Sequence, residues 1–151
     1  MAGTLFGALT RATNLLSRQL EERTTELGIR SVEYLVLRAA SMYPGASTSE
    51  IRRSLGLRDA AFSDVVRRTV YRGFVVQERF PGDGRTRRLA LTFPGSVACG
   101  ITAGIHAELE AEIGVGPWME ETIDRVDTVG RRLLGIPPVE LYLDGLPVDT
   151  A

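Results

Sequence analysis

The segment from Ser47 to Phe93 constrains the fold most, because glycines divide it into short periodic runs. Ser47 and Glu50 have the spacing of a capping box, in which each side chain accepts a backbone N–H of the other residue at the start of a helix. A short helix is therefore expected over residues 47–55. A second helix is predicted over residues 60–72, and a glycine follows each of the two.

Two strand-like runs follow these helices. Residues 74–79 are rich in aromatic and β-branched side chains, and in residues 88–93 Leu and Phe alternate with Arg, Ala and Thr. Residues 80–87 contain a Pro-Gly and an Asp-Gly pair, which favour a hairpin loop. Two short helices followed by a two-stranded ribbon are the plan of a winged helix-turn-helix. We therefore expect a mainly α fold with a small β-hairpin wing, of the α+β class.

A long amphipathic run precedes this segment. A first helix is predicted over residues 4–27, where leucines recur at three- and four-residue steps. A stripe of this length exceeds what the edge of a small domain needs, so we expect it to pack against another surface. A second helix is predicted over residues 32–43, with Ser31 as its cap. Asp59 is the corresponding cap of the helix over residues 60–72.

Two more helices are predicted after the ribbon. The first extends from Pro94 to Ile113, with apolar residues at every fourth position and Thr92 as its cap. The second covers residues 118–136, and a tail of residues 137–151 follows. No apolar run approaches the ~20 residues that span a bilayer. The first residues also lack the pattern of a signal peptide, so a cytoplasmic protein with no membrane partner is expected.

The charge is distributed unevenly along the chain. Residues 45–93 hold ten arginines and five acidic residues, a net charge of +5, although the whole chain has a net charge of −1. Residues 94–151 hold three arginines and ten acidic residues, a net charge of −7. A basic middle between neutral and acidic flanks indicates that one segment faces a polyanion, with a solvated charged surface as the alternative.

Several short motifs occur in the order and at the spacing of a known family. They are Ser49-Glu50-Ile51, Leu55-Gly56-Leu57, Arg72-Gly73-Phe74-Val75, Asp83-Gly84-Arg85 and Leu91-Thr92-Phe93-Pro94-Gly95. Through them the chain resembles the MarR family of bacterial transcriptional regulators over about residues 15–113. Each motif is weak alone, and their order makes the resemblance specific.

The resemblance implies one MarR-like domain that forms a homodimer. Residues 1–27 and 94–136 would supply the dimerisation helices, and residues 31–93 the winged helix-turn-helix. The implied function is a regulator, a repressor by analogy, that binds pseudo-palindromic operators in double-stranded DNA. In the family a small-molecule effector often releases the DNA.

The resemblance also implies which side chains meet DNA. On the helix over residues 60–72 they are those that point away from its buried side: Ala60, Ala61, Ser63, Asp64, Arg67 and Arg68. Serine is suited to donate to a base or phosphate, alanine to touch a thymine methyl, and arginine to contact phosphates. Ser47 and Ser49, at the start of the preceding helix, complete this set.

Asp64 departs from the family, whose members often carry a basic or polar residue at this position. A carboxylate beside phosphates is repelled unless it accepts from cytosine N4 or pairs with Arg68 one helical turn later. The base-reading surface is therefore poor in donors, and readout is expected to depend on the wing, on phosphates and on DNA shape. The same feature supports an alternative, a winged-helix protein with weakened DNA readout that acts as a protein-interaction module.

In the hairpin, Asp83 and Arg85 match the family's D-x-R motif. The family analogy has the aspartate orient an arginine toward the minor groove. Arg85 and Arg87 are the predicted contacts at the tip of the wing, with Arg88 beside them. A plain exposed turn is the alternative.

The resemblance also implies a ligand pocket between the dimer helices and the winged module. Its candidate lining residues are Tyr34, Arg38, Met42, Tyr43 and Trp118. Core packing explains the same residues equally well.

No pattern in the chain indicates catalysis, a cofactor or a metal site. The chain has no lysine, and thus no phosphate-binding loop of the G-x-x-x-x-G-K type. The single histidine, His106, has Glu110 one turn away and Cys99 about two turns away, which is too few ligands for zinc. Cys99, the single cysteine, has no basic neighbour in sequence to stabilise a thiolate, so a packed thiol is expected. We therefore predict no catalytic residue and no enzyme.

Overall fold

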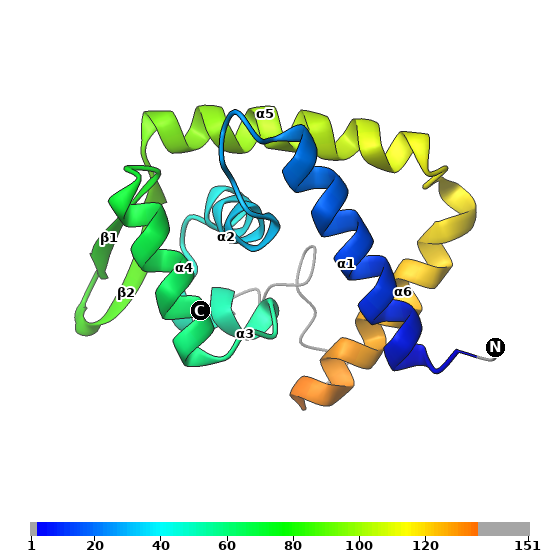
Figure 1. The fold of residues 1–151 in the computed structure, drawn as a ribbon. Helices are drawn as coiled ribbons and strands as arrows, with labels where there is room; N and C mark the ends of the chain where they lie inside the picture. Colours follow the sequence, from blue (N-terminus) through cyan, green and yellow to red (C-terminus); the bar gives the residue numbers. More distant parts are fainter. Residues whose placement is uncertain (1–2, 136–151) are drawn as a thin grey trace.

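The computed structural model describes residues 3–135, which form six helices and one two-stranded sheet (Figure 1). Along the chain they are α1 (Leu5–Arg23), α2 (Ser31–Met42), α3 (Thr48–Ser54), α4 (Asp59–Tyr71), β1 (Val75–Phe80), β2 (Asp83–Leu91), α5 (Phe93–Glu112) and α6 (Pro117–Leu134). The expected mainly α fold with a hairpin wing is confirmed. The tail predicted for residues 137–151 lies outside the described residues.

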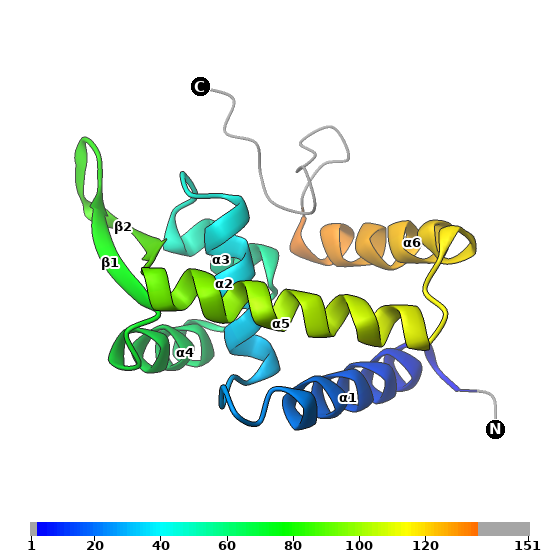
Figure 2. The ribbon, with the colours of Figure 1, turned by 90° about the horizontal axis from the view of Figure 1, so that it is seen from above.

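The long helix α5 joins two parts of the molecule. In Figure 1, α2, α3, α4 and the hairpin gather beneath its N-terminal half, and α1 and α6 descend from its C-terminal half. Seen from above, α1 and α6 lie on opposite sides of α5 (Figure 2). A compact winged module is therefore connected to an open frame of three long helices.

The apolar core lies in the winged module. It is built around α2, whose Tyr34, Val36 and Leu37 are at most 1% exposed, and every other part of the module contributes to it. Helix α4 buries Phe62, Val65, Val66 and Thr69, on the side opposite the residues predicted to meet DNA. From α1, only Leu20 is fully buried, and α6 buries no residue.

Two of the predicted helix starts are confirmed. The Ser47 hydroxyl accepts the backbone N–H of Glu50 at 3.2 Å, and the Glu50 carboxylate accepts the backbone N–H of Ser47 at 2.6 Å, which is the capping box. The Thr92 hydroxyl accepts the backbone N–H of Gly95 at 3.1 Å at the start of α5. These bonds satisfy N–H groups that no helical carbonyl can reach.

Two predicted caps are wrong by one residue. Ser31 and Asp59 are the first residues of their helices, and the cap positions are Arg30 and Arg58. In each case the polar side chain has a partner outside its own helix. Ser31 donates to Glu21 of α1 at 3.1 Å, and the Asp59 carboxylate pairs with Arg52 of α3 at 2.9 Å.

The hairpin is longer and its turn tighter than predicted. Strand β2 begins at Asp83 instead of residue 88, and Phe80 pairs with Asp83 across a two-residue turn. The outer half of this ribbon extends beyond the core and carries arginines, so the apolar alternation that marks a strand is absent there. Phe93, expected in the strand, is the first residue of α5.

Candidate nucleic-acid interface

The exposed side of α4 carries most of the side chains predicted to meet DNA. Ala60, Ala61, Ser63 and Arg67 are exposed, opposite the side that the helix buries. A helix of this size fits the major groove of B-DNA, and its first turns are the ones that reach base edges. The exposed residues of α4 begin in those turns.

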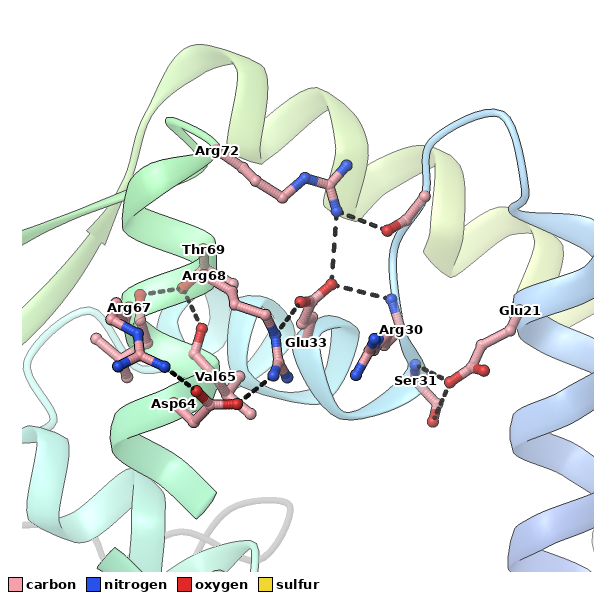
Figure 3. Close-up of polar contacts among 12 residues, drawn as sticks. Glu21, Arg30, Ser31, Glu33, Asp64, Val65, Arg67, Arg68, Thr69 and Arg72 are labelled. Atoms are coloured by element: carbon pink, nitrogen blue, oxygen red, sulfur yellow. Dashed lines mark hydrogen bonds and ion pairs between the residues drawn. The ribbon is translucent and has the colours of Figure 1, made fainter. Parts of the chain in front are cut away.

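Asp64 and Arg68 are half-buried and occupied by ion pairs. The Asp64 carboxylate pairs with the guanidinium groups of both Arg67 and Arg68 (Figure 3). Of the environments considered for this carboxylate, the structure shows the pair with Arg68. Arg68 also bonds Glu33 of α2, with 2.9 Å between its Nε and Oε1 of the carboxylate. Arg67 therefore remains the more exposed of the two cations, with 79% of its side chain accessible.

A groove of about 630 Å³ lies between α3, α4 and β1. Its lining residues are Thr48, Ser49, Arg52, Asp59, Phe62, Ser63, Val66, Arg67, Val70, Tyr71 and Gln77. The lining combines hydroxyl, amide, guanidinium and carboxylate groups with apolar side chains, and its Asp59 carboxylate pairs with Arg52. Such a surface offers hydrogen-bond donors to an anionic backbone.

The two serines at the start of α3 differ in their surroundings. Ser47 is 9% exposed, and its hydroxyl caps the helix. Ser49 is exposed and lines the groove. Of the pair, Ser49 is the one whose hydroxyl faces solvent.

The wing presents arginines on both of its strands. Arg85 and Arg87 are exposed, whereas Arg88 is half-buried and pairs with Glu78 at 2.9 Å. Arg79 lies directly opposite Arg87 in the ribbon. Like charges placed opposite each other destabilise a ribbon, and a neighbouring polyanion relieves the repulsion. Arg79 was not among the predicted contacts, because only the strand register of the structure shows that it lies opposite Arg87.

Asp83 shapes the turn of the wing. Its carboxylate accepts the backbone N–H of Arg85 at 2.8 Å and the hydroxyl of Thr86 at 2.5 Å. These two bonds hold the pKa of the Asp83 carboxyl below its ordinary value. Asp83 thus holds the backbone of Arg85 in position at the turn of the wing.

The residues predicted for an effector pocket are only partly brought together. Tyr34 lines a pocket of about 160 Å³ between α1, α2 and α5, whose other lining residues are Thr13, Leu16, Ser17, Leu20, Ser31, Leu35 and His106. Burial raises the pKa of the Tyr34 hydroxyl, and the nearby Arg38 guanidinium acts in the opposite direction. This lining includes none of Arg38, Met42, Tyr43 and Trp118, and Trp118 is exposed on α6.

His106 and Cys99 have ordinary surroundings on α5. The ring of His106 lies 5.6 Å from that of Tyr34, and its Nε2 is 3.4 Å from Glu110. Cys99 is buried, and burial raises the pKa of its thiol. Within residues 3–135, no three His, Cys, Asp or Glu side chains are grouped so that they could hold a metal ion. None of the helices in this range is long and apolar enough to cross a bilayer.

The helical frame leaves large apolar side chains exposed. On α6 these are Trp118, Ile123, Val126, Val129, Leu133 and Leu134. On α1 they are Leu5, Phe6, Leu15 and Leu16. Large apolar side chains that are exposed together commonly mark a surface of association.

The winged module matches the MarR family, and the fold is found in solved structures. The MarR-family model covers residues 27–86. A MarR-family transcriptional regulator from Rhodococcus sp. RHA1 is 17% identical with a TM-score of 0.68, over 86% of this chain and 91% of that chain. No curated protein sequence is a significant match.

Two further solved structures were determined with bound molecules. MepR of S. aureus, in a complex with DNA, is 14% identical with a TM-score of 0.73, over 87% of this chain and 98% of that chain. The PcaV transcriptional regulator of Streptomyces coelicolor, in complex with its natural ligand, is 24% identical with a TM-score of 0.68, over 88% and 99% of the two chains. The resemblance to the MarR family is therefore confirmed: residues 27–86 match the family, and the chain has the fold of its solved regulators.

Proposed function

We propose that this protein is a homodimeric, DNA-binding transcriptional regulator. One combination of features carries the proposal. The first turns of α4 expose their side chains to solvent, and on the wing Arg79 lies directly opposite Arg87 in the ribbon. An α-helix fits into the major groove of B-DNA, and the wing would place positive charge beside that groove. MepR, which shares the fold, is solved in a DNA complex.

The contacts follow from the exposure of each side chain. Ala60, Ala61 and Ser63 would face base edges, and Arg67 the phosphates. On the wing, Arg85 and Arg87 would reach the backbone or the minor groove, with Arg79 and Arg88 beside them. We assign the Ser47 hydroxyl and the Asp64 carboxylate to holding the interface in shape, because both are occupied by bonds within the chain.

The helical frame supports the homodimer. Helix α6 buries no residue, although it carries a row of large apolar side chains. A second copy related by two-fold symmetry would cover this surface and place two α4 helices on one face of a duplex. In this proposal residues 1–27 and 94–136 form the dimer, and residues 31–93 form the DNA-binding module of a single domain.

We also propose that a small molecule regulates the protein, which acts as a repressor in the cytoplasm. The pocket beside Tyr34 lies where the winged module meets α1 and α5, so an occupant would contact both parts. PcaV, of the same fold, was solved with its natural ligand. The proposal includes no catalytic residue and no cofactor.

Selection of bound duplexes from a genomic library, followed by fluorescence anisotropy at several salt concentrations, tests the DNA-binding proposal. A regulator with several phosphate contacts gives a linear fall of log K with log salt, with a slope of about −0.9 for each phosphate neutralised. Arg85→Ala is expected to weaken binding to all duplexes and to make the slope less steep by about 0.9. Arg125→Ala, on the exposed face of α6, is the matched control and leaves binding unchanged.

A protein-interaction module is the second candidate. It is favoured by Asp64, which pairs with both arginines of α4, and by the two alanines at the start of that helix. If no duplex binds even at low salt, the regulator proposal is wrong and this candidate replaces it.

A further inference from the structure

A buried carboxylate lies between the recognition helix α4 and the core helix α2. The side chain of Glu33 is only 4% exposed, and three groups surround it (Figure 3). Its Oε1 accepts from Nε of Arg68 at 2.9 Å, and its Oε2 accepts the backbone N–H of Arg30 at 3.0 Å and lies 3.5 Å from Nη1 of Arg72. A buried charge of this kind is stable only while its partners stay in place.

Glu33 belongs to a set of ion pairs that extends through Arg68 to Asp64, which also pairs with the exposed Arg67. Glu33, Asp64, Arg68 and Arg72, here called the Glu33 cluster, comprise two carboxylates and two guanidinium groups. Arg68 joins the two acids, since it bonds Glu33 through Nε and pairs with Asp64 through Nη1. Its charge is therefore compensated within the protein, unlike that of the exposed arginines of the wing.

The same cluster fastens the end of α4 to the loop that connects α1 and α2. Arg72 donates from Nη1 to the carbonyl oxygen of Gly28 at 2.6 Å, and from Nη2 to that of Leu27. Its guanidinium also stacks on the ring of Phe74, with 4.6 Å from Cζ to the ring centroid. The last turns of the recognition helix are thus bound to a different part of the chain by directed bonds.

The loop is in turn bound to α1. Glu21 accepts the backbone N–H of Ser31 at 2.9 Å and the Ser31 hydroxyl at 3.1 Å (Figure 3). A continuous set of polar contacts therefore extends from α1, through the start of α2, to α4. In the proposed function, α1 belongs to the dimer and α4 to the DNA contact.

We propose that Glu33 and Arg68 are positioning residues that fix α4 relative to the dimer helices, and so determine the half-site spacing that the dimer accepts. The inference rests on the proposed function. Changing the spacing by one base pair rotates one half-site by about 34° around the duplex axis. A rigidly held pair of helices cannot follow this rotation, whereas a loosened pair can.

The test compares Arg68→Gln with the wild-type protein on three duplexes. The probes are the tightest duplex selected by the wild-type protein, and two derivatives with one base pair inserted or deleted at its centre. We expect Arg68→Gln to lower the ratio of affinities between the selected duplex and its derivatives at least threefold. The slope of log K against log salt should stay unchanged. A direct phosphate contact would instead reduce this slope by about 0.9 and leave the ratio unchanged.

Two further variants complete the test. Glu33→Gln, measured where thermal unfolding shows it folded, should lower the same ratio. Val36→Ala, a core variant of α2, should weaken all three duplexes equally, since loss of stability reduces only the folded fraction. An Arg68→Gln ratio equal to that of the wild type overturns the inference while the regulator proposal stands. If the wild-type protein binds no duplex, both are wrong.

Discussion

Asp64 determines how much unpaired positive charge the exposed side of α4 carries. It pairs with Arg67 and Arg68, which lie three and four residues later on the same face of α4. The spacing predicts the pair with Arg68 from the sequence, because residues one turn apart are neighbours on a helix. Removing the carboxylate would leave Arg67 free while Arg68 keeps its bond to Glu33.

Asp64→Asn is therefore expected to tighten DNA binding. Loss of a negative charge near phosphates is worth on the order of 1 kcal/mol, or about fivefold in affinity at low salt. Anisotropy titrations at low and high salt measure the change, which should shrink as salt is added. Asp124→Asn, on α6, is the control. Weaker binding by Asp64→Asn would show that the carboxylate itself reads a base.

Gly95 is required by a close approach of two backbones. A Cβ atom at this position would lie 1.9 Å from the carbonyl oxygen of Phe74, which also accepts the backbone N–H of Thr92 at 3.0 Å. Gly95→Ala must move the start of α5 away from β1, at a cost of roughly 3 kcal/mol in the free energy of unfolding. Gly84→Ala, which has open space around its Cβ, is the control for denaturant titrations. Equal stability of the two variants would contradict the packing described.

Local patterns predict the helices of the winged module well, and the contacts between them poorly. The burial of four residues on α4 and the capping box at Ser47 follow from spacings within one element. The bond between Glu33 and Arg68 joins residues 35 positions apart, and no periodicity reveals it. The outer half of β2 was missed for a related reason, since its strand character comes from pairing with β1 rather than from apolar alternation.

At the scale of elements, a bidentate ion pair joins the C-terminal ends of α1 and α5. Arg23 at the end of α1 donates to both carboxylate oxygens of Glu112 at the end of α5, at 2.9 and 2.6 Å. The bond to Arg23 lowers the pKa of the Glu112 carboxyl below its ordinary value of 4.5. A lowered pKa in the folded state stabilises the fold above the unfolded pKa, and this contribution is lost as the pH falls through the folded pKa.

Glu112→Gln is expected to reduce the thermal stability at neutral pH and to change its pH dependence. The difference in melting temperature from the wild type should be constant above about pH 4.5 and should diminish as the pH falls further. Thermal unfolding followed by circular dichroism between pH 3 and 7 measures it. Glu120→Gln, on the exposed face of α6, should show no such trend. A difference independent of pH would show that the pair contributes nothing.

At the scale of the whole molecule, the proposed dimer would cover the apolar surface that the helical frame exposes. The apolar row on α6 could be predicted from the sequence, but that none of it is buried within residues 3–135 follows only from the structure. Periodicity shows that a helix has an apolar face, not which surface covers it. That the apolar face of α6 is covered by a second copy of the chain is therefore a proposal about the dimer.

Ile123→Asp is expected to disrupt the dimer, because it places a charge among the exposed apolar side chains of α6. Sedimentation equilibrium should give about 33 kDa for the wild type, twice the 16.5 kDa of one chain, and a value near one chain for the variant. Arg125→Ala, on the polar face of the same helix, should leave the dimer intact. A wild-type protein that sediments as a single chain would contradict the proposed assembly.

Hydroxyl-radical footprinting of the selected duplex tests the central claim most directly, because it records where two recognition helices meet one DNA. We expect two protected half-sites related by two-fold symmetry, with centres about 10 base pairs apart. Protection should disappear when the wing arginines Arg85 and Arg87 are replaced by alanine. A single protected patch, or none at a protein concentration that saturates the anisotropy signal, would contradict it.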